Sequence, residues 1–291
     1  MSKIGGWDAV FGRSAPLDME IGFGNGEYLA RLSQSSWERD FVGLEVSWNS
    51  MKRALRRLYD PPRTNVKIMR LAARPALELL FSPKSLSIIR ALFPVPWPNE
   101  KQAKRRMFDK DFLNLIANRL KDDGQFYMVT DNRVLTDWTI DQAVGTDLCL
   151  EVNEQQAMLN TKYERKWLSG GQRNFFHIIG RKTGHPHLSA SGFNEMKPSY
   201  SSSINPQNYR PENRTGDPTV IFGGFIYDST LKEGLLAAKV IEDQFIQEFH
   251  IRVALTPEGR WKLAPALANQ VFPTSGVKLA LALATLEEPS T

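Results

Sequence analysis

Short apolar runs alternate with amphipathic helical stretches through the first 180 residues of this chain. This alternation is typical of βαβ units, in which parallel strands build a sheet and helices cross over its faces. It predicts strands near Leu17–Gly22, Asp40–Val46, Asn65–Leu71, Leu86–Phe93 and Gln125–Thr130, and a closing strand at Arg173–Arg181. It predicts helices near Gly26–Ser35, Ser47–Tyr59, Arg74–Phe81 and Asp109–Leu120, the last ending in the turn sequence Asp122-Asp123-Gly124. Residues 1–184 are therefore expected to form an α/β domain with a mostly parallel sheet.

The composition changes after residue 184. Residues 185–218 are rich in Pro, Ser, Asn and Gly without apolar periodicity, which predicts a linker. Residues 219–291 contain alternating or apolar runs at Val220–Tyr227, Phe249–Leu255 and Val277–Leu286, with the turn sequence Thr256–Gly259 between the last two. These features predict a small, mainly antiparallel β domain with a packing, dimerisation or partner-contact role.

Basic residues are concentrated in the first domain. Residues 1–184 contain 28 Lys and Arg against 21 Asp and Glu, whereas residues 185–291 contain 9 against 11. A net charge of +7 on one domain is expected of a polyanion binder, because each neutralised phosphate releases condensed counterions. From charge alone, the favoured interpretation is that the surplus lysines and arginines only solvate the surface.

The sequence also bears on compartment and metal binding. It contains no apolar stretch of about 18 to 20 residues and no signal-peptide core, which predicts a cytoplasmic protein without membrane contact. Cys149 is the only cysteine, so we expect it to be passive and buried. His185 and His187 flank a proline without a neighbouring acid or cysteine pattern, so we expect no metal site. No pattern in the chain indicates an oligomeric state.

A glycine-rich segment joins the first predicted strand to the first helix. It reads Glu20-Ile21-Gly22-Phe23-Gly24-Asn25-Gly26. Glycines at 22, 24 and 26 let the backbone turn sharply and approach a ligand closely, at a helix N-terminus that can face an anionic group. The G-x-G-x-G spacing suits S-adenosylmethionine rather than a dinucleotide, although a plain glycine turn fits it as well.

An acid follows at the end of the second predicted strand, in Gly43-Leu44-Glu45-Val46. It lies about 20 residues beyond the glycine segment, where a carboxylate can accept hydrogen bonds from both hydroxyls of a ribose. The alternative is a surface acid beside the helix that starts near Ser47. Together with the glycine segment, Glu45 favours a nucleoside cofactor.

A proline-rich loop, Phe93-Pro94-Val95-Pro96-Trp97-Pro98, follows the fourth predicted strand and precedes Lys101, Lys104, Arg105 and Arg106. Its prolines fix a rigid loop where such sheets bind ligands, and Trp97 offers a stacking surface. Basic side chains beside an aromatic platform suit RNA. A structural Pro-Trp loop before a solvated basic helix is the alternative.

These motifs together resemble the bacterial tRNA (guanine-N7)-methyltransferases over residues 17–182. The resemblance rests on Glu20–Gly26, Gly43–Val46, the proline-rich loop with Lys104-Arg105-Arg106, Thr130-Asp131-Asn132 and Thr161-Lys162-Tyr163-Glu164. It implies a class I, Rossmann-like methyltransferase that uses S-adenosylmethionine, without a metal, to methylate N7 of a guanine in the tRNA variable loop.

The resemblance also implies residue roles. Cofactor contacts would come from Glu20 and Glu45, with Gly22, Gly24 and Gly26 shaping the loop. The target nucleotide would meet Asp131, Thr161, Lys162, Tyr163 and Glu164, and tRNA phosphate would meet Lys104, Arg105 and Arg106. From the residues alone, Asp131 is equally a turn residue, and Thr161–Glu164 is equally an ordinary helix cap.

Three positions depart from the family pattern. Ala72 replaces an acid near the adenine, Val95 replaces the acid of F-x-D-P-W, and Asn99 replaces a basic residue on the substrate side. Ala72 and Val95 stand at cofactor and catalytic positions, so Asp131 and Glu164 become the candidates for the missing carboxylate. Two further hypotheses follow: a tRNA-binding paralogue with weak or no catalysis, and a methyltransferase for another RNA or a small acceptor.

Overall fold

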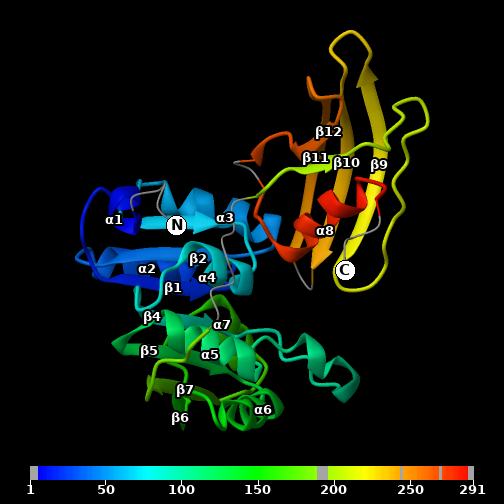
Figure 1. Cartoon of the computed structure of the whole chain (residues 1–291). Helices are drawn as coiled ribbons and strands as arrows, with labels where there is room; N and C mark the ends of the chain where they lie inside the picture. The colour runs from blue at the N-terminus through cyan, green and yellow to red at the C-terminus, as the bar shows by residue number, and fades with distance from the viewer. Residues whose placement is uncertain (1–5, 189–195, 243–244, 269–270, 288–291) are drawn as a thin grey trace. The chain divides into compact units, whose positions relative to one another are not determined.

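One seven-stranded sheet organises the first part of the chain, with the strand order β3-β2-β1-β4-β5-β7-β6 (Figure 1). Its strands are β1 (Leu17–Ile21), β2 (Asp40–Leu44), β3 (Val66–Met69), β4 (Leu86–Leu92), β5 (Leu120–Thr130), β6 (Leu148–Gln156) and β7 (Asn174–Lys182). β1 to β5 pair in parallel, and β7 is antiparallel to both of its neighbours. The strand order reverses between β1 and β4, and such a switch point opens a ligand crevice at the carboxyl ends of the strands.

The computed structural model describes residues 6–188, 196–242, 245–268 and 271–287. They fall into two units, Met1–Ser191 and Gly192–Thr291. Within these residues, no helix is long and apolar enough to cross a membrane, and no group of three or more His, Cys, Asp or Glu side chains is placed to hold a metal ion.

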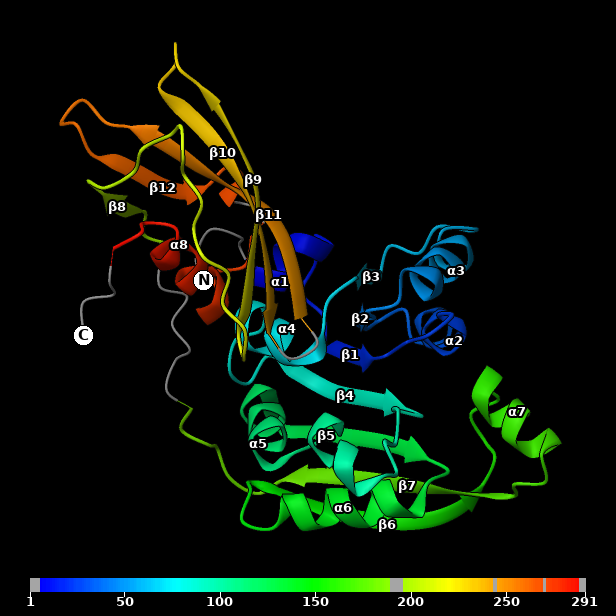
Figure 2. The same cartoon turned by 90° about the vertical axis from the view of Figure 1, so that its right-hand side faces the viewer.

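The helices of the first unit connect successive strands, except α1, which precedes β1. They are α1 (Gly6–Phe11), α2 (Glu27–Ser35), α3 (Trp48–Leu58), α4 (Ala73–Leu80), the 3-10 helix η1 (Glu100–Arg105), α5 (Lys110–Arg119), α6 (Arg133–Ala143) and α7 (Lys162–Ser169). α2 packs on α3, and α4 packs on α5. Right-handed crossovers place these two pairs on opposite faces of the sheet. Figure 2 shows the arrowheads of β1, β4 and β5 pointing toward the same end of the unit, where α2, α3 and α7 also lie.

The predicted mostly parallel α/β fold is confirmed, and most predicted elements agree with the structure to within two residues. β5 is an exception because it begins at Leu120 instead of Gln125. Leu86 pairs with Leu120 and Ile88 with Gln125, so residues 121–124, which include the predicted turn, bulge out of the ladder. β6, α6 and α7 were not predicted; most side chains of β6 and α7 are exposed, and α7 is only eight residues long.

β1 is buried at all five positions although it carries two acids. Asp18 accepts hydrogen bonds from Arg39, at 2.5 Å from Nη2 and 3.1 Å from Nε, and from Arg90 Nη1 at 2.8 Å. The Asp18 side chain is fully buried, and Arg90 is 12% exposed. Two arginines therefore neutralise the one carboxylate, and Arg90 stands beside Glu20 in the register of β1 and β4.

The second unit is a five-stranded antiparallel sheet with the order β8-β12-β11-β10-β9, so the predicted mainly antiparallel domain is confirmed. Its elements are β8 (Ser199–Ser201), β9 (Thr219–Asp228), β10 (Glu233–Glu242), β11 (Phe245–Leu255), β12 (Trp261–Pro265) and α8 (Ser275–Leu283). α8 contains most of the apolar run Val277–Leu286 and packs on β9 and β10.

Part of the predicted linker belongs to this second unit. β8 pairs with β12, and Ile204 and Tyr209 are buried in the apolar core of the unit. Composition did not reveal this, because β8 is held by backbone pairing, and the large side chains that pack on the core, among them Ile204 and Tyr209, follow no apolar period. Residues 189–195 of the predicted linker lie outside the described residues.

Two smaller expectations concern single side chains. The prediction that Cys149 is buried is wrong, because it lies exposed on β6, an edge strand whose side chains mostly face solvent. His185 lies against Lys182, with 3.2 Å between Nδ1 and Nζ, and 3.5 Å from Asn118 Nδ2. His187 is exposed.

Candidate cofactor and substrate site

The glycine segment forms a tight loop between β1 and α2. Gly22, Gly24 and Gly26 have φ of 69°, 57° and 71°, in the left-handed region that favours glycine. The N–H groups of Gly22 and Phe23 donate to the Leu44 carbonyl at 2.8 and 3.3 Å. The loop is thereby anchored to the end of β2, at the switch point of the sheet.

The space around the glycines differs. A Cβ at Gly26 would lie 2.7 Å from Cβ of Ala54 on α3, whereas a Cβ at Gly22 would meet no heavy atom within 4 Å. Gly26 therefore permits close packing of α3 against the loop, while Gly22 leaves open space beside it.

This difference predicts unequal effects of the same substitution. Gly26→Ala should lower the free energy of unfolding by about 2–5 kcal/mol, because left-handed strain of about 1–2 kcal/mol adds to overpacking of about 1–3 kcal/mol. Gly22→Ala, the matched control, should cost only the strain, about 1–2 kcal/mol. Urea denaturation of both variants measures the difference, and equal losses would show that the contact with Ala54 relaxes freely.

Glu45 connects the glycine loop to the start of α3. Its Oε2 accepts the Gly24 N–H at 3.0 Å, and its Oε1 accepts the N–H groups of Val46 and Ser47, each at 2.9 Å. An ionised carboxylate offers about four acceptor positions, so Glu45 keeps capacity for a ligand hydroxyl. Its half-buried place at the carboxyl end of β2 suits the predicted ribose contact.

Glu20 is the most perturbed acid of the site. It is 3% exposed, and burial raises its pKa to about 8 against the opposing charges of Arg90 and Arg31. Its Oε2 is buried without a hydrogen-bond partner among the described residues. A buried acceptor without a donor costs about 1–3 kcal/mol, so this oxygen suits a ligand that supplies an N–H.

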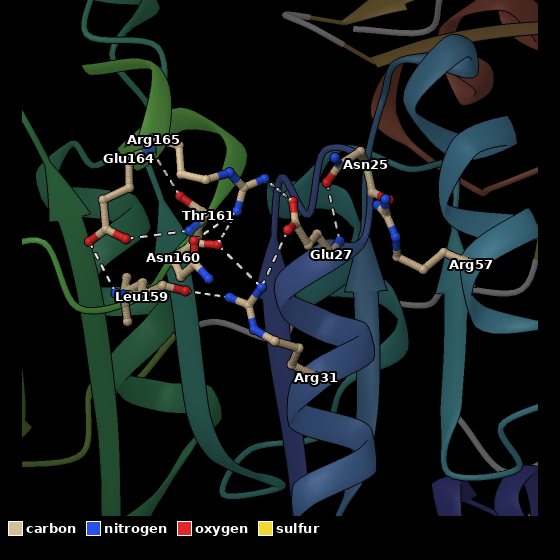
Figure 3. Close-up of polar contacts among 9 residues, drawn as sticks. All are labelled: Asn25, Glu27, Arg31, Arg57, Leu159, Asn160, Thr161, Glu164 and Arg165. Carbon is tan, nitrogen blue, oxygen red and sulfur yellow. Dashed lines mark hydrogen bonds and ion pairs between the residues drawn. The ribbon is translucent and has the colours of Figure 1, made fainter. Parts of the chain in front are cut away.

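A polar cluster joins α2 to the segment before α7 and to α7 itself (Figure 3). Arg165 Nη2 donates to Glu27 Oε2 at 2.9 Å, and this hydrogen bond lowers the pKa of the Glu27 carboxyl. Arg31 donates to the Asn160 carbonyl at 3.2 Å and to the Leu159 carbonyl. These contacts join residues more than 120 positions apart in the sequence beside the glycine loop. No local sequence motif predicted these contacts.

Thr161 and Glu164 form a capping box at the start of α7. Thr161 Oγ1 accepts the Glu164 N–H at 3.1 Å, and the Glu164 carboxylate accepts the Thr161 N–H at 3.3 Å. The same carboxylate accepts the N–H groups of Met158 and Leu159 at 2.8 and 3.1 Å, and it is fully buried. The helix-cap interpretation therefore describes this pair, and Glu164 is not placed to replace the missing family acid.

Tyr163 is the residue of this motif that faces the loop. Its ring lies 6.2 Å from that of Phe93, centroid to centroid, and its Cε2 would be 3.9 Å from a Cβ at Gly24. The side chain remains 48% exposed. Tyr163 and Phe93 thus form an aromatic surface next to the glycine loop, whereas Lys162 points into solvent.

Asp131 follows directly after β5, and Asn132 caps α6 by accepting the Leu135 N–H at 2.8 Å. The Asp131 side chain is half-buried, and within the described chain its carboxylate has no hydrogen bond or ion pair. The Asp131 carboxylate is therefore available to a ligand at the C-terminal ends of the strands. The Glu164 carboxylate, in contrast, is occupied by the N–H groups of the α7 cap.

Arg106 supports the proline-rich loop from inside. It is 4% exposed, its Nε donates to the Trp97 carbonyl at 3.1 Å, and its guanidinium lies 5.5 Å from the Trp138 ring centroid. Trp97 has φ of 42° and Phe93 of 54°, so the loop needs this support. The structure therefore gives Arg106 a structural role instead of the predicted phosphate contact.

The other predicted residues after β4 are accessible. Lys104 and Arg105 are exposed, and the Arg105 guanidinium lies 5.0 Å from the Trp97 ring centroid. Asn99 caps η1 by accepting the Lys101 N–H at 3.1 Å. The expected combination of an aromatic platform and basic side chains is present with three exposed basic members in place of four, because Lys101 is exposed and Arg106 is buried.

The two cofactor-side departures are also located. Val95 is 62% exposed in the proline-rich loop, and Ala72 is the half-buried N-cap of α4 without a side-chain cap. Neither substitution fills a core position, so both change the chemistry of the edge without changing the packing of the fold.

Comparison with known proteins identifies the family. A family model described as "Putative methyltransferase" matches residues 14–177. A tRNA (guanine-N(7)-)-methyltransferase of Thermotoga maritima is 36% identical over 179 residues, which cover 60% of this chain and 57% of that protein. Proteins with the same name from Chlorobium phaeobacteroides and Aquifex aeolicus are 32% identical over 169 residues and 28% identical over 252 residues.

The extent of these matches differs. The Chlorobium match covers 58% of this chain and 83% of that protein, and the Aquifex match covers 84% of each. The Aquifex match therefore extends into the second unit, whereas the resemblance found in the sequence covered residues 17–182 only. The chain spans little more than half the length of the Thermotoga relative that it matches.

A solved structure of an antibiotic-related methyltransferase aligns with a TM-score of 0.50 at 17% identity, covering 60% of this chain and 92% of that one. This likeness shows the methyltransferase fold. Because the family model spans more than half of the chain and includes the glycine loop, the proline-rich loop and the capping box of α7, this chain belongs to the methyltransferase family that includes the bacterial tRNA (guanine-N7)-methyltransferases.

Proposed function

We propose that this protein is a cytoplasmic enzyme that transfers a methyl group from S-adenosylmethionine to N7 of a guanine in the variable loop of tRNA. The observation that carries the proposal is Glu20 Oε2, which is buried and has no hydrogen-bond partner among the described residues, beside three left-handed glycines at the switch point of the sheet. The names of the curated relatives supply the reaction and the RNA class.

The residues present fit the cofactor. Glu20 would accept a hydrogen bond from its ammonium group, and Glu45 from its ribose hydroxyls, while Gly22 leaves room for close approach. Ala72 offers the adenine amine no side-chain acceptor, which costs affinity by roughly 0.5–3 kcal/mol unless water replaces it. Bound S-adenosylmethionine supplies an electrophilic methyl group.

Guanine N7 has a lone pair and no proton, so the chain needs no general base to create the nucleophile. Its task is to orient the base, and well-oriented reactants can gain roughly 7–11 kcal/mol of barrier reduction. Tyr163 and Phe93 offer a face on which the guanine can stack. Asp131 can accept from the guanine edge and stabilise positive charge as the ring becomes cationic.

Cofactor binding should depend on pH through Glu20. Its raised pKa of about 8 means that the acid is neutral below that pH in the free protein, whereas an ammonium group binds best to the carboxylate. The Kd for S-adenosylmethionine should therefore fall, by at most about tenfold per unit, as pH rises from about 6 toward 8, and rise again once the ammonium group of the cofactor loses its proton. Titration calorimetry of Glu20→Gln should give weaker binding without this slope. An unchanged slope in that variant would assign the titration to another group.

The reaction itself is tested with radiolabelled S-adenosylmethionine and unmodified tRNA transcripts, digested to nucleosides after incubation. We expect labelled 7-methylguanosine, and none from a transcript whose variable-loop guanine is replaced by adenine. Cofactor and tRNA binding without any labelled product would instead support the paralogue without catalysis. Label on a different nucleoside or RNA would move the proposal to another acceptor.

A further inference from the structure

α3 presents a strongly basic surface outside the motifs of the cofactor and substrate site. The helix has four basic residues and no acidic residue. It buries Met51, Ala54 and Leu58 against the unit, so its basic side chains face outward. We name Trp48, Lys52, Arg53 and Arg56 the α3 basic face; all four are exposed.

The charge of this face is not neutralised within the described chain, where Lys52, Arg53 and Arg56 form no ion pair. Elsewhere in the unit, arginines do so commonly: Arg13, Arg39, Arg74, Arg90, Arg133 and Arg165 each pair with a carboxylate. A basic last turn is favoured by the helix dipole, which accounts for Arg56. It does not account for Lys52 and Arg53, and Lys52 repels Arg56 at i,i+4.

An aromatic ring belongs to the same face. Trp48 is 51% exposed, and Lys52 Nζ lies 5.5 Å from its ring centroid. Trp97 and Arg105 show the same combination after β4, which lies on the other side of β1 from β2. Exposed aromatic rings beside free cations suit nucleic acid, because the ring stacks on a base while the cation meets phosphate.

The position of α3 places this face beside the cofactor loop. Its N-cap Ser47 follows Glu45, whose carboxylate accepts the Gly24 N–H, and Arg57 Nη1 donates to the Asn25 carbonyl at 2.8 Å (Figure 3). Figure 2 shows α3 and α7 on either side of the end toward which β1, β4 and β5 point. A large polyanion that reaches the loop can therefore meet cations from two directions.

We propose that the α3 basic face is a second phosphate-binding surface for the RNA substrate, separate from Lys104 and Arg105. The inference rests on the proposed function. It adds that α3, the helix after β2, binds phosphates of the RNA. An anionic membrane shares the charge preference of RNA. RNA is favoured because the face adjoins the site in which the target base must sit.

The test is the variant Lys52→Gln/Arg53→Gln/Arg56→Gln in the full chain, with Arg57 retained because it supports the loop. We expect the Kd for tRNA to rise about 10- to 100-fold near 0.1 M salt, and the slope of log K against log salt to become shallower by about 2 to 3. The Kd for S-adenosylmethionine should not change, which would show that the fold and the glycine loop remain intact.

The control removes the same number of basic charges from the opposite edge of the sheet, as Lys84→Gln/Lys121→Gln/Arg181→Gln; Lys84 and Arg181 are paired there with Asp122 and Glu151. Lys121 and Arg181 line a cleft of about 580 Å³ there, at the amino ends of β4 and β5. This control should bind tRNA nearly as the unchanged protein does. Equal losses in both triple variants would mean that only net charge matters, and would overturn the inference.

The remaining outcomes separate the two proposals. If the unchanged protein methylates tRNA but the α3 variant keeps its Kd and salt slope, the α3 inference falls alone. If tRNA affinity drops in the α3 variant while the unchanged protein forms no 7-methylguanosine, the surface stands and methyl transfer falls. Absence of tRNA binding overturns both. Vesicles of phosphatidylglycerol that bind through this face, with tRNA binding unaffected, would assign it to a membrane.

Discussion

Replacing Val95 by Asp is expected to raise the rate of methyl transfer on the order of 100- to 1000-fold. Methylation of N7 leaves the guanine ring cationic, so a carboxylate near the ring is needed more in the transition state than in the ground state. Preorganised electrostatic groups of this kind change kcat by about 10² to 10³ each. Val95 offers no such group, and Glu164 is committed to the cap of α7.

The site accepts this substitution because Val95 is 62% exposed and lies between two fixed points of the loop. The Phe93 N–H donates to the Val129 carbonyl at 2.7 Å, and Arg106 holds the Trp97 carbonyl. A side-chain change at 95 therefore leaves the backbone where it is. The new carboxylate should raise kcat and change the Kd for tRNA little.

Val95→Asn is the matched control, because it has nearly the shape of Asp without its charge. Single-turnover rates with saturating tRNA and cofactor compare the three proteins. Equal rates for the Asp and Asn variants would exclude the charge as the cause. If the Asp variant shows no gain, the developing charge is already met by another acid, and Asp131→Asn should then lower the rate of the unchanged protein.

Asp18→Asn is expected to lower the free energy of unfolding by about 3–5 kcal/mol. The substitution keeps the volume of the side chain but removes the charge that Arg39 and Arg90 share. Removing one partner of a buried ion pair costs this much because the remaining charge stays desolvated. Arg90 is 12% exposed, so water cannot replace the lost carboxylate.

Tryptophan fluorescence in urea measures this loss in the right part of the chain, since six of the seven tryptophans lie in the first unit. Asp137→Asn is the control, because its ion pair with Arg133 has both side chains more than half exposed. Exposed pairs contribute little, so this control should unfold at the same urea concentration. Similar losses in both variants would mean that the Asp18 cluster is solvated in solution.

The positions of the glycine loop and of Glu45 could be predicted because their signal is local. The three glycines of the loop and Glu45 lie next to their strands in the sequence. A strand, a turn that needs positive φ and a helix follow one another there, so each could be recognised from its neighbours. The parallel sheet was predictable for the same reason. Apolar periods mark buried elements wherever those elements contact the core.

The substrate side was predicted less well because its roles depend on contacts between distant elements. Adjacent arginines 105 and 106 look alike in sequence, yet one lies over Trp97 in solvent and the other is buried against Trp138 of α6. The contact between Glu27 and Arg165 joins residues 138 positions apart. Only the folded structure shows which of two neighbouring arginines is buried and which distant residues form an ion pair.

The burial of Arg106 has a consequence for engineering. A library that randomises residues 104, 105 and 106 as one block, in order to retune RNA affinity, would mix two surface positions with one that determines the loop conformation. Most of its members would fail by misplacing Trp97, and the survivors would appear to require arginine for binding. Holding Arg106 fixed while varying Lys104, Arg105 and the α3 basic face would let affinity be selected separately from folding.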